Sequence, residues 1–457
     1  MSNAHTPPNL ADLRGRVRGA VHGPTDPGYP AVGFNVAVDR RPAAVVDVAD
    51  AADVAASVAF AATHGLTVAV FATGHGGTPV GPTTILLRTT DLDSCVVDAE
   101  SRTARVGAGV RWQTVIDAAA PHGLAALCGS APSVGVAGYI SGGGIGPLVR
   151  TVGSSADHVR EITVVTGDAA VRTVSATENP ELFWGLRGGK ATLGIITEVV
   201  LDLPEIAEFF GGAVYFDGGD AAAVLRAWRE WSAGLPDEAS TSVALLNLPP
   251  LPDVPPMLAG KLTVAVRYAC LADPESAAEW FAPMRAAASP LLDAVGPMPY
   301  AAIGAVHADP PGPMPATEHG GLLAALPDEA IDILHGLATS PAAPLLPVVE
   351  VRQLGGAFAR EPEVRSALCH RDAAFNLNMV GILADEEAAG AVLGAIGSSY
   401  EALGPWLTGG VLPNFVATDD RARIRDCYDD DTAAWLSALA DQLDPKGVYR
   451  VGQVMRG

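Results

Sequence analysis

Apolar residues in the first half of the chain follow two different periods, which predicts strands and amphipathic helices in turn. Short runs rich in Val, Ile and Leu predict buried strands, whereas longer segments with apolar residues every three or four positions predict helices. The predicted helices span residues 50–64 and 112–122. The predicted strands span residues 43–48, 68–71, 84–87, 103–107, 161–166 and 171–174, the last two as a hairpin around Gly167 and Asp168.

The pattern changes after Leu203-Pro204. Apolar periodicity there predicts longer strands separated by helices, which is typical of a second structural unit. Two proline-rich stretches, 249–256 and 309–315, predict loops, and we expect the second to be a mobile loop or a lid. The predicted helices of this part are 221–235 and 273–288, and the predicted strands are 240–248, 261–268, 348–354 and 375–380.

Composition describes a globular protein with several cores. The chain has 457 residues, of which 49% are hydrophobic and 18% charged, enough for two to three domain-sized units. Its net charge of −22 argues against nucleic acid and against anionic membranes as partners, because both are bound through basic patches.

Cysteine usage and the termini bear on the compartment. The five cysteines are scattered and form no C-x-x-C pair, which favours free thiols in a reducing compartment over a disulfide framework or a zinc site. The amino terminus shows no signal pattern, and no apolar run is long enough to span a bilayer. We therefore expect a soluble, cytoplasmic protein.

Three glycine-rich blocks carry the candidate chemistry. Val70–Gly77 (VFATGHGG) places a histidine in a loop directly after a predicted strand. Glycines at such a position expose backbone N–H groups that can face a pyrophosphate, although a structural histidine is the alternative. Ala131–Gly146 (APSVGVAGYISGGGIG) and Asn179–Gly189 (NPELFWGLRGG) follow, and the glycine density of the former suggests close approach by a flat or charged ligand.

The order of these blocks resembles the FAD-binding fold of the vanillyl-alcohol oxidase (PCMH) superfamily, and within it the berberine-bridge-enzyme-like branch. That branch shows R-S-G-G-H, then C-P-x-V-G-x-G-G-H-x-x-G-G-G-x-G, then N-P-x-L-F-W-x-L-R-G-G-x-x-x-x-G-I-V-T. The resemblance runs from about Phe34 to Leu203 and resumes near the carboxyl end, where Leu443–Arg450 resembles Y-D-P-x-N-L-F-R.

The resemblance implies an α+β fold with a discontinuous cofactor domain. A PCMH-type FAD-binding domain of two α+β subdomains would comprise residues 1–205 and be completed by a carboxyl-terminal segment, 406–457. Residues 206–405 would form a substrate domain, an antiparallel sheet backed by helices.

The implied cofactor is FAD, attached through one covalent bond. His75 matches the histidine that the family bonds to the flavin 8α-methyl group, while Phe71 and Thr73 replace the usual Arg and Gly. Ala131 stands where many members have a second linking cysteine, so a bicovalent flavin is excluded by the motif. The residues expected to contact FAD are His75, Phe71, Ala72, Thr73, Gly74, Gly76, Ala131, Val134, Gly135, Gly138, Gly142, Gly143, Gly144, Ile196 and Asn414.

Two further positions bear on flavin chemistry. Val134 falls where the family controls oxygen access, and a valine there is permissive for reoxidation by O2. Tyr139 replaces a histidine near the flavin pyrimidine edge. Its phenol would donate a hydrogen bond to the reduced flavin, or it packs against a helix.

The general base is where the chain departs most from the family. The family's tyrosine is replaced by Phe415, and the alternative strand position is Asn378; neither side chain accepts a proton near neutral pH. Glu350 and His370 remain as candidate bases, with Arg352 alternating with Glu350 on one strand face. The sequence does not rank the two.

Three functions remain open at this point. The first is an FAD-dependent oxidoreductase that removes hydride from a small secondary-metabolite intermediate, with O2 as electron acceptor. The second is a flavoprotein that uses FAD as a scaffold for a non-redox cyclisation, isomerisation or elimination, and the third is a catalytically silent FAD-binding protein. We expect no metal and leave the oligomeric state open.

Overall fold

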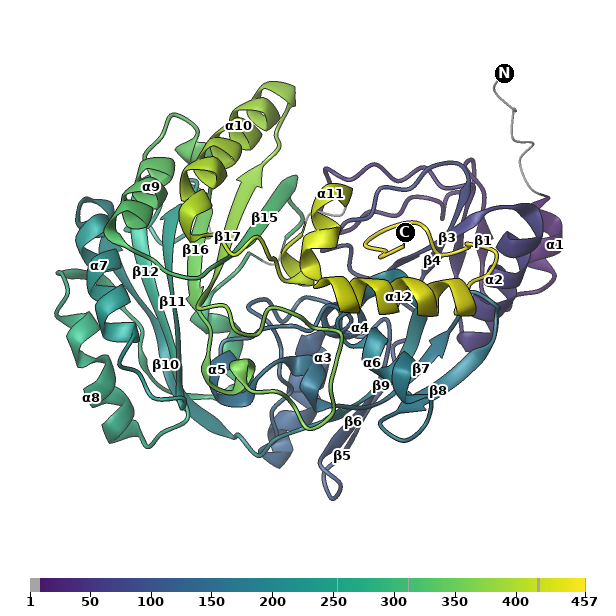
Figure 1. Cartoon of the computed structure of the whole chain (residues 1–457), viewed down its shortest axis with the longest axis horizontal. Helices are drawn as coiled ribbons and strands as arrows, with labels where there is room; N and C mark the ends of the chain where they lie inside the picture. Colours follow the sequence, from purple (N-terminus) through teal and green to yellow (C-terminus); the bar gives the residue numbers. More distant parts are fainter. Residues whose placement is uncertain (1–8, 253, 311, 417–419, 457) are drawn as a thin grey trace.

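The computed structural model describes residues 9–252, 254–310, 312–416 and 420–456, and it shows two parts lying side by side (Figure 1). One part is built on two small sheets and the other on a single large sheet. The fold is therefore α+β, as predicted.

The first small sheet has the strand order β1-β2-β4-β3. Helix α2 (Ala51–His64) joins β2 to β3; Asp50 caps its first turn by accepting from the Asp53 N–H, and Gly65 ends it with a φ of 65°. The strands predicted here and the intervening helix are confirmed. Their bounds are β1 Val21–His22, β2 Ala44–Asp47, β3 Thr67–Phe71 and β4 Thr84–Arg88.

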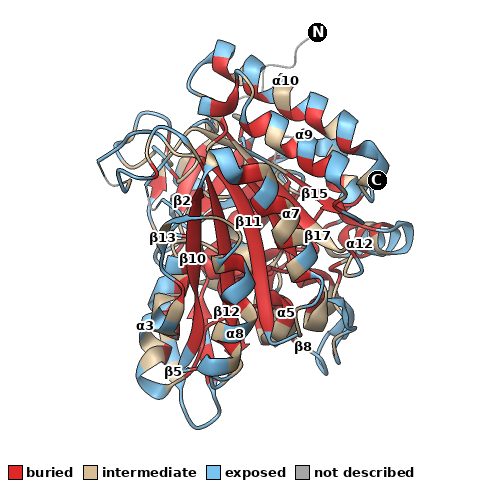
Figure 2. Cartoon of the chain, turned by 90° about the vertical axis from the view of Figure 1, so that its left-hand side faces the viewer, coloured by how far each residue is buried: buried red, intermediate tan, exposed pale blue. Residues whose placement is uncertain are grey.

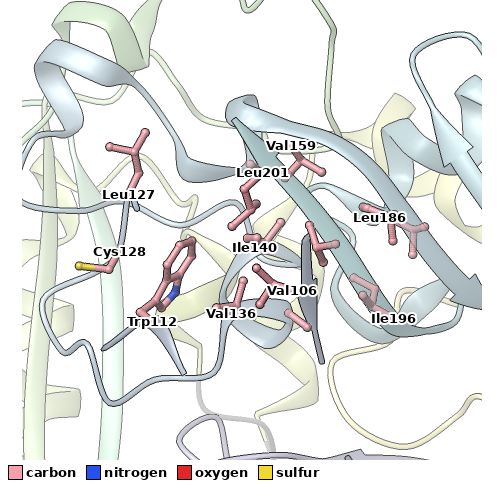
Figure 3. Packing of buried hydrophobic residues seen from close by; sticks show 14 of the residues in the cluster. Val106, Trp112, Leu127, Cys128, Val136, Ile140, Val159, Leu186, Ile196 and Leu201 are labelled. Atoms are coloured by element: carbon pink, nitrogen blue, oxygen red, sulfur yellow. The ribbon is translucent and has the colours of Figure 1, made fainter. Parts of the chain in front are cut away.

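The second small sheet is antiparallel, in the order β5-β6-β9-β7-β8. The predicted hairpin is confirmed as β7 and β8, and the predicted helix 112–122 is α3 (Trp112–Ala119) extended by a 3-10 turn. Helix and sheet enclose a buried hydrophobic cluster that includes Trp112 (Figure 3). The strands are β5 Cys95–Asp98, β6 Thr103–Gly107, β7 Val159–Val165, β8 Val171–Ser175 and β9 Ile195–Asp202.

The large sheet has the order β13-β10-β12-β11-β16-β17-β15, with β14 paired to β10. Four helices cover one of its faces, and their outer sides are exposed (Figure 2). The strands are β10 Glu208–Asp217, β11 Ala239–Asn247, β12 Leu262–Cys270, β13 Pro290–Asp293, β14 Gly296–Pro299, β15 Ala316–Leu323, β16 Val348–Gln353 and β17 Phe375–Ile382. The helices are α7 Ala221–Ser232, α8 Pro274–Arg285, α9 Asp328–Ala338 and α10 Glu386–Leu403.

The two faces of this sheet differ in chemistry because successive side chains alternate. The helix-covered face is apolar, with Val243, Val351 and Leu377 in its core. The opposite face carries a polar stripe, because residues paired directly across strands share a face. The register assigns to this stripe Arg267, Ser242, Arg352, Asn376, Glu350, Asn378 and, two residues from Gly320, Glu318.

The carboxyl-terminal segment returns to the two small sheets. The Val68 N–H donates to the Val448 carbonyl (2.9 Å), and the Asp168 N–H donates to the Leu443 carbonyl (2.9 Å), at the end of α12 (Asp430–Leu443). These contacts support the division into residues 1–205, 206–405 and 406–457, which remains a proposal. The other helices are α1 Leu10–Arg14, α4 Val136–Ile140, α5 Val149–Val152, α6 Pro180–Leu186 and α11 Arg421–Ile424.

Several elements were not predicted from the sequence, among them β10, β15, α9, α10 and α12. Residues 249–256 form neither helix nor strand where the structure describes them, as expected; Asp253 lies outside the described residues. Pro311, within the expected lid, also lies outside them, as do Met1 to Pro8. All five cysteines are free thiols, and across the described ranges we find no helix with the length and apolarity needed to cross a membrane.

Candidate functional site

The loop after β3 holds His75 in a fixed position. Its ring stacks on Phe34 at a centroid distance of 4.0 Å and an interplanar angle of 9°. Nδ1 lies 3.1 Å from the Thr73 hydroxyl, and Nε2 lies 3.5 Å from the Ser133 hydroxyl. Because Ser133 belongs to the second glycine-rich block, the histidine stands where the two blocks meet.

His75 is a neutral imidazole over the physiological range. Burial, together with the nearby Arg111 guanidinium, lowers its pKa to about 4. A neutral ring keeps a lone pair on one nitrogen. Such a nitrogen can bond to a carbon, whereas a protonated imidazole cannot.

The backbone around His75 leaves room for a flat or charged ligand. A Cβ atom placed on Gly76 or Gly138 would meet no atom within 4 Å, and both residues are exposed. Gly135 faces Thr73 and Ala72, so the first and second blocks lie against each other. This is a cradle with exposed backbone and few side chains, and it fits the dinucleotide FAD.

The remaining glycines of the second block serve internal packing. A Cβ at Gly142 would collide with Lys190 and the Asn414 amide, and one at Gly143 would collide with Leu368. Gly143 and Gly144 also have φ values of 88° and 84°, which favour glycine. The inference that all these glycines face a ligand is therefore corrected: at these three positions the chain itself approaches closely.

Three predicted cofactor or site residues point into the interior. Phe71 is buried among apolar residues under the guanidinium of Arg40, and Ile196 packs in the cluster around Trp112. The Tyr139 hydroxyl is enclosed by protein and has no hydrogen-bond partner within the described residues, while its ring packs on Gly144. An enclosed hydroxyl cannot also face a flavin, so the packing interpretation of Tyr139 is the correct one.

Ala131 and Val134 belong to the loop that carries Ser133 to His75. The Val134 N–H donates to the Ala131 carbonyl (3.1 Å), and the Val134 carbonyl accepts from the Trp112 N–H (3.0 Å). Both side chains are half-buried. The loop is thereby held beside the imidazole by backbone bonds, as the motif implies.

Lys190 is a site residue that the sequence analysis missed. Its ammonium group donates to the Asn414 amide oxygen and to the Gly138 carbonyl (3.2 Å). Burial lowers the pKa of Lys190 to about 8. It therefore brings a positive charge to the cradle, beside the predicted cofactor residues Gly138 and Asn414.

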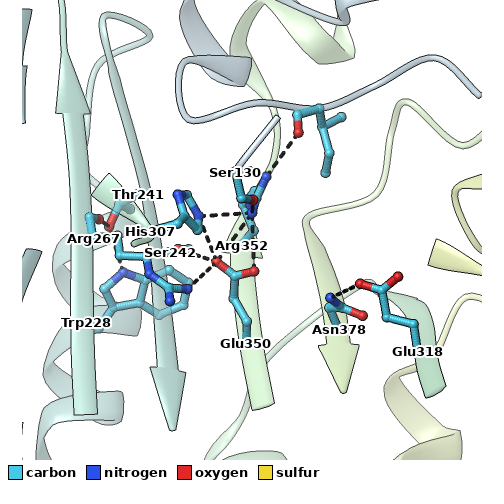
Figure 4. A network of polar contacts seen from close by, with 11 residues as sticks. Ser130, Trp228, Thr241, Ser242, Arg267, His307, Glu318, Glu350, Arg352 and Asn378 are labelled. Atoms are coloured by element: carbon cyan, nitrogen blue, oxygen red, sulfur yellow. Dashed lines mark hydrogen bonds and ion pairs between the residues drawn. The ribbon is translucent and has the colours of Figure 1, made fainter. Parts of the chain in front are cut away.

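Glu350 lies at the centre of a buried ion cluster on the polar stripe (Figure 4). Its carboxylate accepts from the Ser242 hydroxyl (2.7 Å), from Arg267 (2.9 Å) and from Arg352 (3.2 Å). His307 completes the cluster, with Arg352 donating to its Nε2 (3.0 Å). Glu350 and Arg352 face one side of the strand as predicted, at 4% and 3% exposure.

This environment does not suit a catalytic base. Although burial raises the pKa of Glu350, the opposing charges of Arg352 and Arg267 hold it well below its usual range. Arg352 also donates to the Ile145 carbonyl (3.1 Å) and the Ser130 hydroxyl (2.8 Å), so it joins the large sheet to the second glycine-rich block. We correct the roles of both residues: they are structural partners.

His370 lies against the carboxyl-terminal segment and not in the Glu350 ion cluster. One ring nitrogen lies 2.9 Å from the Asp426 carbonyl, the ring packs on Gly410, and the backbone has a φ of 60°. In the described part of the chain, no contact joins it to Glu350. The hypothesis that His370 is the base is therefore not supported, since its partners are backbone groups of the carboxyl-terminal segment.

The two positions where the family places its base lie close together. Asn378 on β17 pairs with Gly320 on β15, and a Cβ at Gly320 would collide with Phe415. The Asn378 amide donates to the Glu318 carboxylate (3.1 Å; Figure 4). Glu318 was not among the residues predicted from the sequence. No metal-binding group of three or more His, Cys, Asp or Glu residues occurs where the structure is described.

Comparison with known proteins agrees with this geometry. A family model described as "FAD binding domain" matches residues 42–175, a segment that includes His75 and the whole block Ala131–Gly146. This segment is therefore similar to FAD binding domains.

Curated relatives of this chain include proteins named as oxidases. It is 36% identical over 197 residues to (R)-6-hydroxynicotine oxidase of Paenarthrobacter nicotinovorans, which covers 42% of each chain. It is 30% identical over 219 residues to chitooligosaccharide oxidase of Gibberella zeae, covering 46% of this chain and 44% of the other. The chain thus spans less than half of the length of the curated relatives it matches.

Solved structures show the same fold over nearly the whole chain. The 6-hydroxy-D-nicotine oxidase of Arthrobacter nicotinovorans superposes with a TM-score of 0.81 at 24% identity, covering 95% of this chain and 97% of that one. Berberine-bridge-enzyme-like 1 of Physcomitrella patens gives 0.82 at 18% identity, covering 97% and 98%. The fold agrees with the resemblance to the berberine-bridge-enzyme-like branch of the vanillyl-alcohol oxidase superfamily.

Proposed function

We propose that this protein is an FAD-dependent oxidoreductase that removes hydride from a small molecule, an intermediate of secondary metabolism, and passes the electrons to O2. The observation that carries the proposal is the placement of His75. It is a half-buried, neutral imidazole at the meeting point of two glycine-rich loops, whose backbone is exposed at Gly76 and Gly138. This is the arrangement expected of a histidine that bears a flavin.

FAD would be held by the residues of the cradle and attached once, at His75. The bound flavin supplies an acceptor for two electrons and a proton. The loop around Thr73, Gly74 and Gly76 offers backbone N–H groups, and Lys190 offers a positive charge beside Gly138. Ala131, in the cysteine position, has no atom to form a second bond.

The test of function is flavin reduction under anaerobic conditions. The holoprotein is mixed without O2 with a panel comprising (R)-6-hydroxynicotine, a chitooligosaccharide and a glucooligosaccharide, together with simple amines and alcohols. We expect one class to bleach the visible flavin absorbance and air to restore it with release of H2O2. A flavin that stays oxidised with every member while the protein converts one of them without electron transfer would establish the scaffold function instead.

The covalent attachment has its own test. After acid precipitation the flavin of the wild type is expected to stay with the polypeptide, and His75→Ala is expected to release it or to give apoprotein. His122→Ala, at an exposed histidine outside the three glycine-rich blocks, is the matched control and should keep its flavin. Free FAD in the supernatant of the acid-treated wild type would show that the bond does not exist.

A further inference from the structure

The structure brings together the two positions at which the family places its proton acceptor, and it places a carboxylate next to them. Position 415 is a phenylalanine that packs on Gly320, and position 378 is an asparagine that pairs with Gly320. Neither side chain can accept a proton. Glu318 is the next residue of β15 on the same face.

Strand β15 also lies between two parts of the cradle, the His75 loop and the Lys190–Asn414 contact. Its first residue, Ala316, accepts a hydrogen bond from the Asn35 amide (2.7 Å), and the Asn35 N–H donates to the Gly74 carbonyl (3.2 Å) in the His75 loop. At the other end, Gly320 lies under Phe415, which directly follows Asn414, the partner of Lys190. Glu318 therefore stands between the histidine loop and the Lys190–Asn414 contact.

The charge environment of Glu318 suits a group that changes protonation. Glu318 is an exposed residue, and desolvation of its carboxyl by the neighbouring protein groups raises the pKa. The charges of Asp309 and Glu350 raise the pKa further, whereas the hydrogen bond from Asn378 and the charge of Lys190 lower it. Unlike Glu350, Glu318 has no arginine partner, since its described hydrogen bond comes from a neutral amide.

We propose that Glu318 is the catalytic base of the oxidation, held in position by Asn378. This inference rests on the proposed function. As the substrate C–H bond breaks, its electron pair leaves as hydride to the oxidised flavin. The O–H or N–H bond on the same carbon's heteroatom gives its proton to the Glu318 carboxylate. A C=O or C=N bond forms, and the two electrons pass on to O2, which takes up two protons to become H2O2.

The proposal requires a carboxylate at this position, so Glu318→Gln is the central variant. With the panel member that bleaches wild-type flavin, we expect its anaerobic reduction rate to fall about 10²–10⁴-fold, the usual effect of removing a general base. The acid limb of the pH profile should disappear with it. Glu279→Gln on the outer helix α8 is the matched control, exposed and on the far side of the large sheet, and should behave as wild type.

Asn378→Ala separates positioning from catalysis. Its amide stabilises the ionised form of Glu318, so its loss raises the pKa of the carboxyl. We expect the acid limb to move to higher pH while the plateau rate is largely retained. A variant that merely damaged the fold would lower the rate at all pH values and leave the limb in place, which would contradict the positioning role.

A second readout does not depend on turnover. Benzylammonium and benzoate have similar shapes and opposite charges, and each perturbs the absorbance of the bound flavin when it occupies the site. We expect Glu318→Gln to weaken benzylammonium binding about tenfold or more, through the lost charge-assisted hydrogen bond, and to leave benzoate binding unchanged or stronger.

The outcomes distinguish the two proposals. If no panel member reduces the flavin, the proposed function fails, and the benzylammonium comparison still shows whether Glu318 faces the site. If a substrate reduces wild type and Glu318→Gln at equal rates with the same pH profile, the proposed function stands and Glu318 is not the base. Equal affinity of wild type and Glu318→Gln for benzylammonium would likewise overturn the inference.

Discussion

Replacement of Glu350 by glutamine separates the two roles that sequence and structure assign to this residue. A base in that position would make Glu350→Gln a slow but stable enzyme. In the structure, the carboxylate is the one anion between the guanidinium groups of Arg267 and Arg352 on the polar stripe. Its removal would leave two buried positive charges without a counter-charge, so we expect the variant to be unstable.

The magnitude follows from the burial of all three partners. Their side chains are no more than 6% exposed, which places the pairs in the class of buried ion pairs whose disruption costs about 3–5 kcal/mol. For a unit of about 200 residues, 1 kcal/mol corresponds to roughly 2–4 °C in Tm. We therefore expect the thermal transition of Glu350→Gln to fall by about 5 °C or more.

The assay is thermal unfolding of the holoprotein at neutral pH, with Glu279→Gln as the control that keeps the wild-type transition. A double variant, Arg267→Met with Glu350→Gln, should recover part of the loss, because it removes one of the charges left without a partner. The result that would refute this reasoning is a Glu350→Gln protein with an unchanged Tm and a flavin reduction rate that has fallen about 10²-fold or more.

Two further predictions concern the cradle and the response to pH. Ala131→Cys should form a second flavin bond, because its loop is fixed beside His75; a peptide map that shows a free thiol at this position, with flavin still on His75, would contradict that placement. The pKa of His307 is lowered to about 4 by burial and by Arg267, below its unfolded value of 6.5, so the unfolded chain binds the proton first. The free energy of unfolding should therefore decrease as pH falls from 6.5 towards 4, and His307→Phe should flatten this decrease in denaturant titrations; an unchanged slope would exclude His307 as its source.

The chain carried enough local information for the fold class and for the position of the His75 loop. Strong periodicity predicted β2, α2, β3 and β4, because their apolar side chains are buried in two hydrophobic clusters. The motif predicted that His75 lies in a loop directly after a strand, and the structure shows this loop after β3, with the histidine beside Thr73 two residues away. Contacts between residues only a few positions apart can be predicted from the sequence of one segment.

Only the tertiary structure decided the roles of side chains whose partners are distant in the sequence. Glu350 and Arg267 are separated by 83 positions, so no local pattern shows that the carboxylate is neutralised. Strand β15 was missed because its sequence, ATEHGGLL, lacks alternation and contains two glycines, which Phe415 and Tyr400 require for close packing. The strand forms because β17 pairs with it, 60 residues separating Glu318 from Asn378. Only the pairing of β15 with β17 shows that the Glu318 carboxylate lies beside Asn378 and Phe415, the two positions that lack the expected base. A proposed substitute base needs to be close to these positions in space, not in sequence.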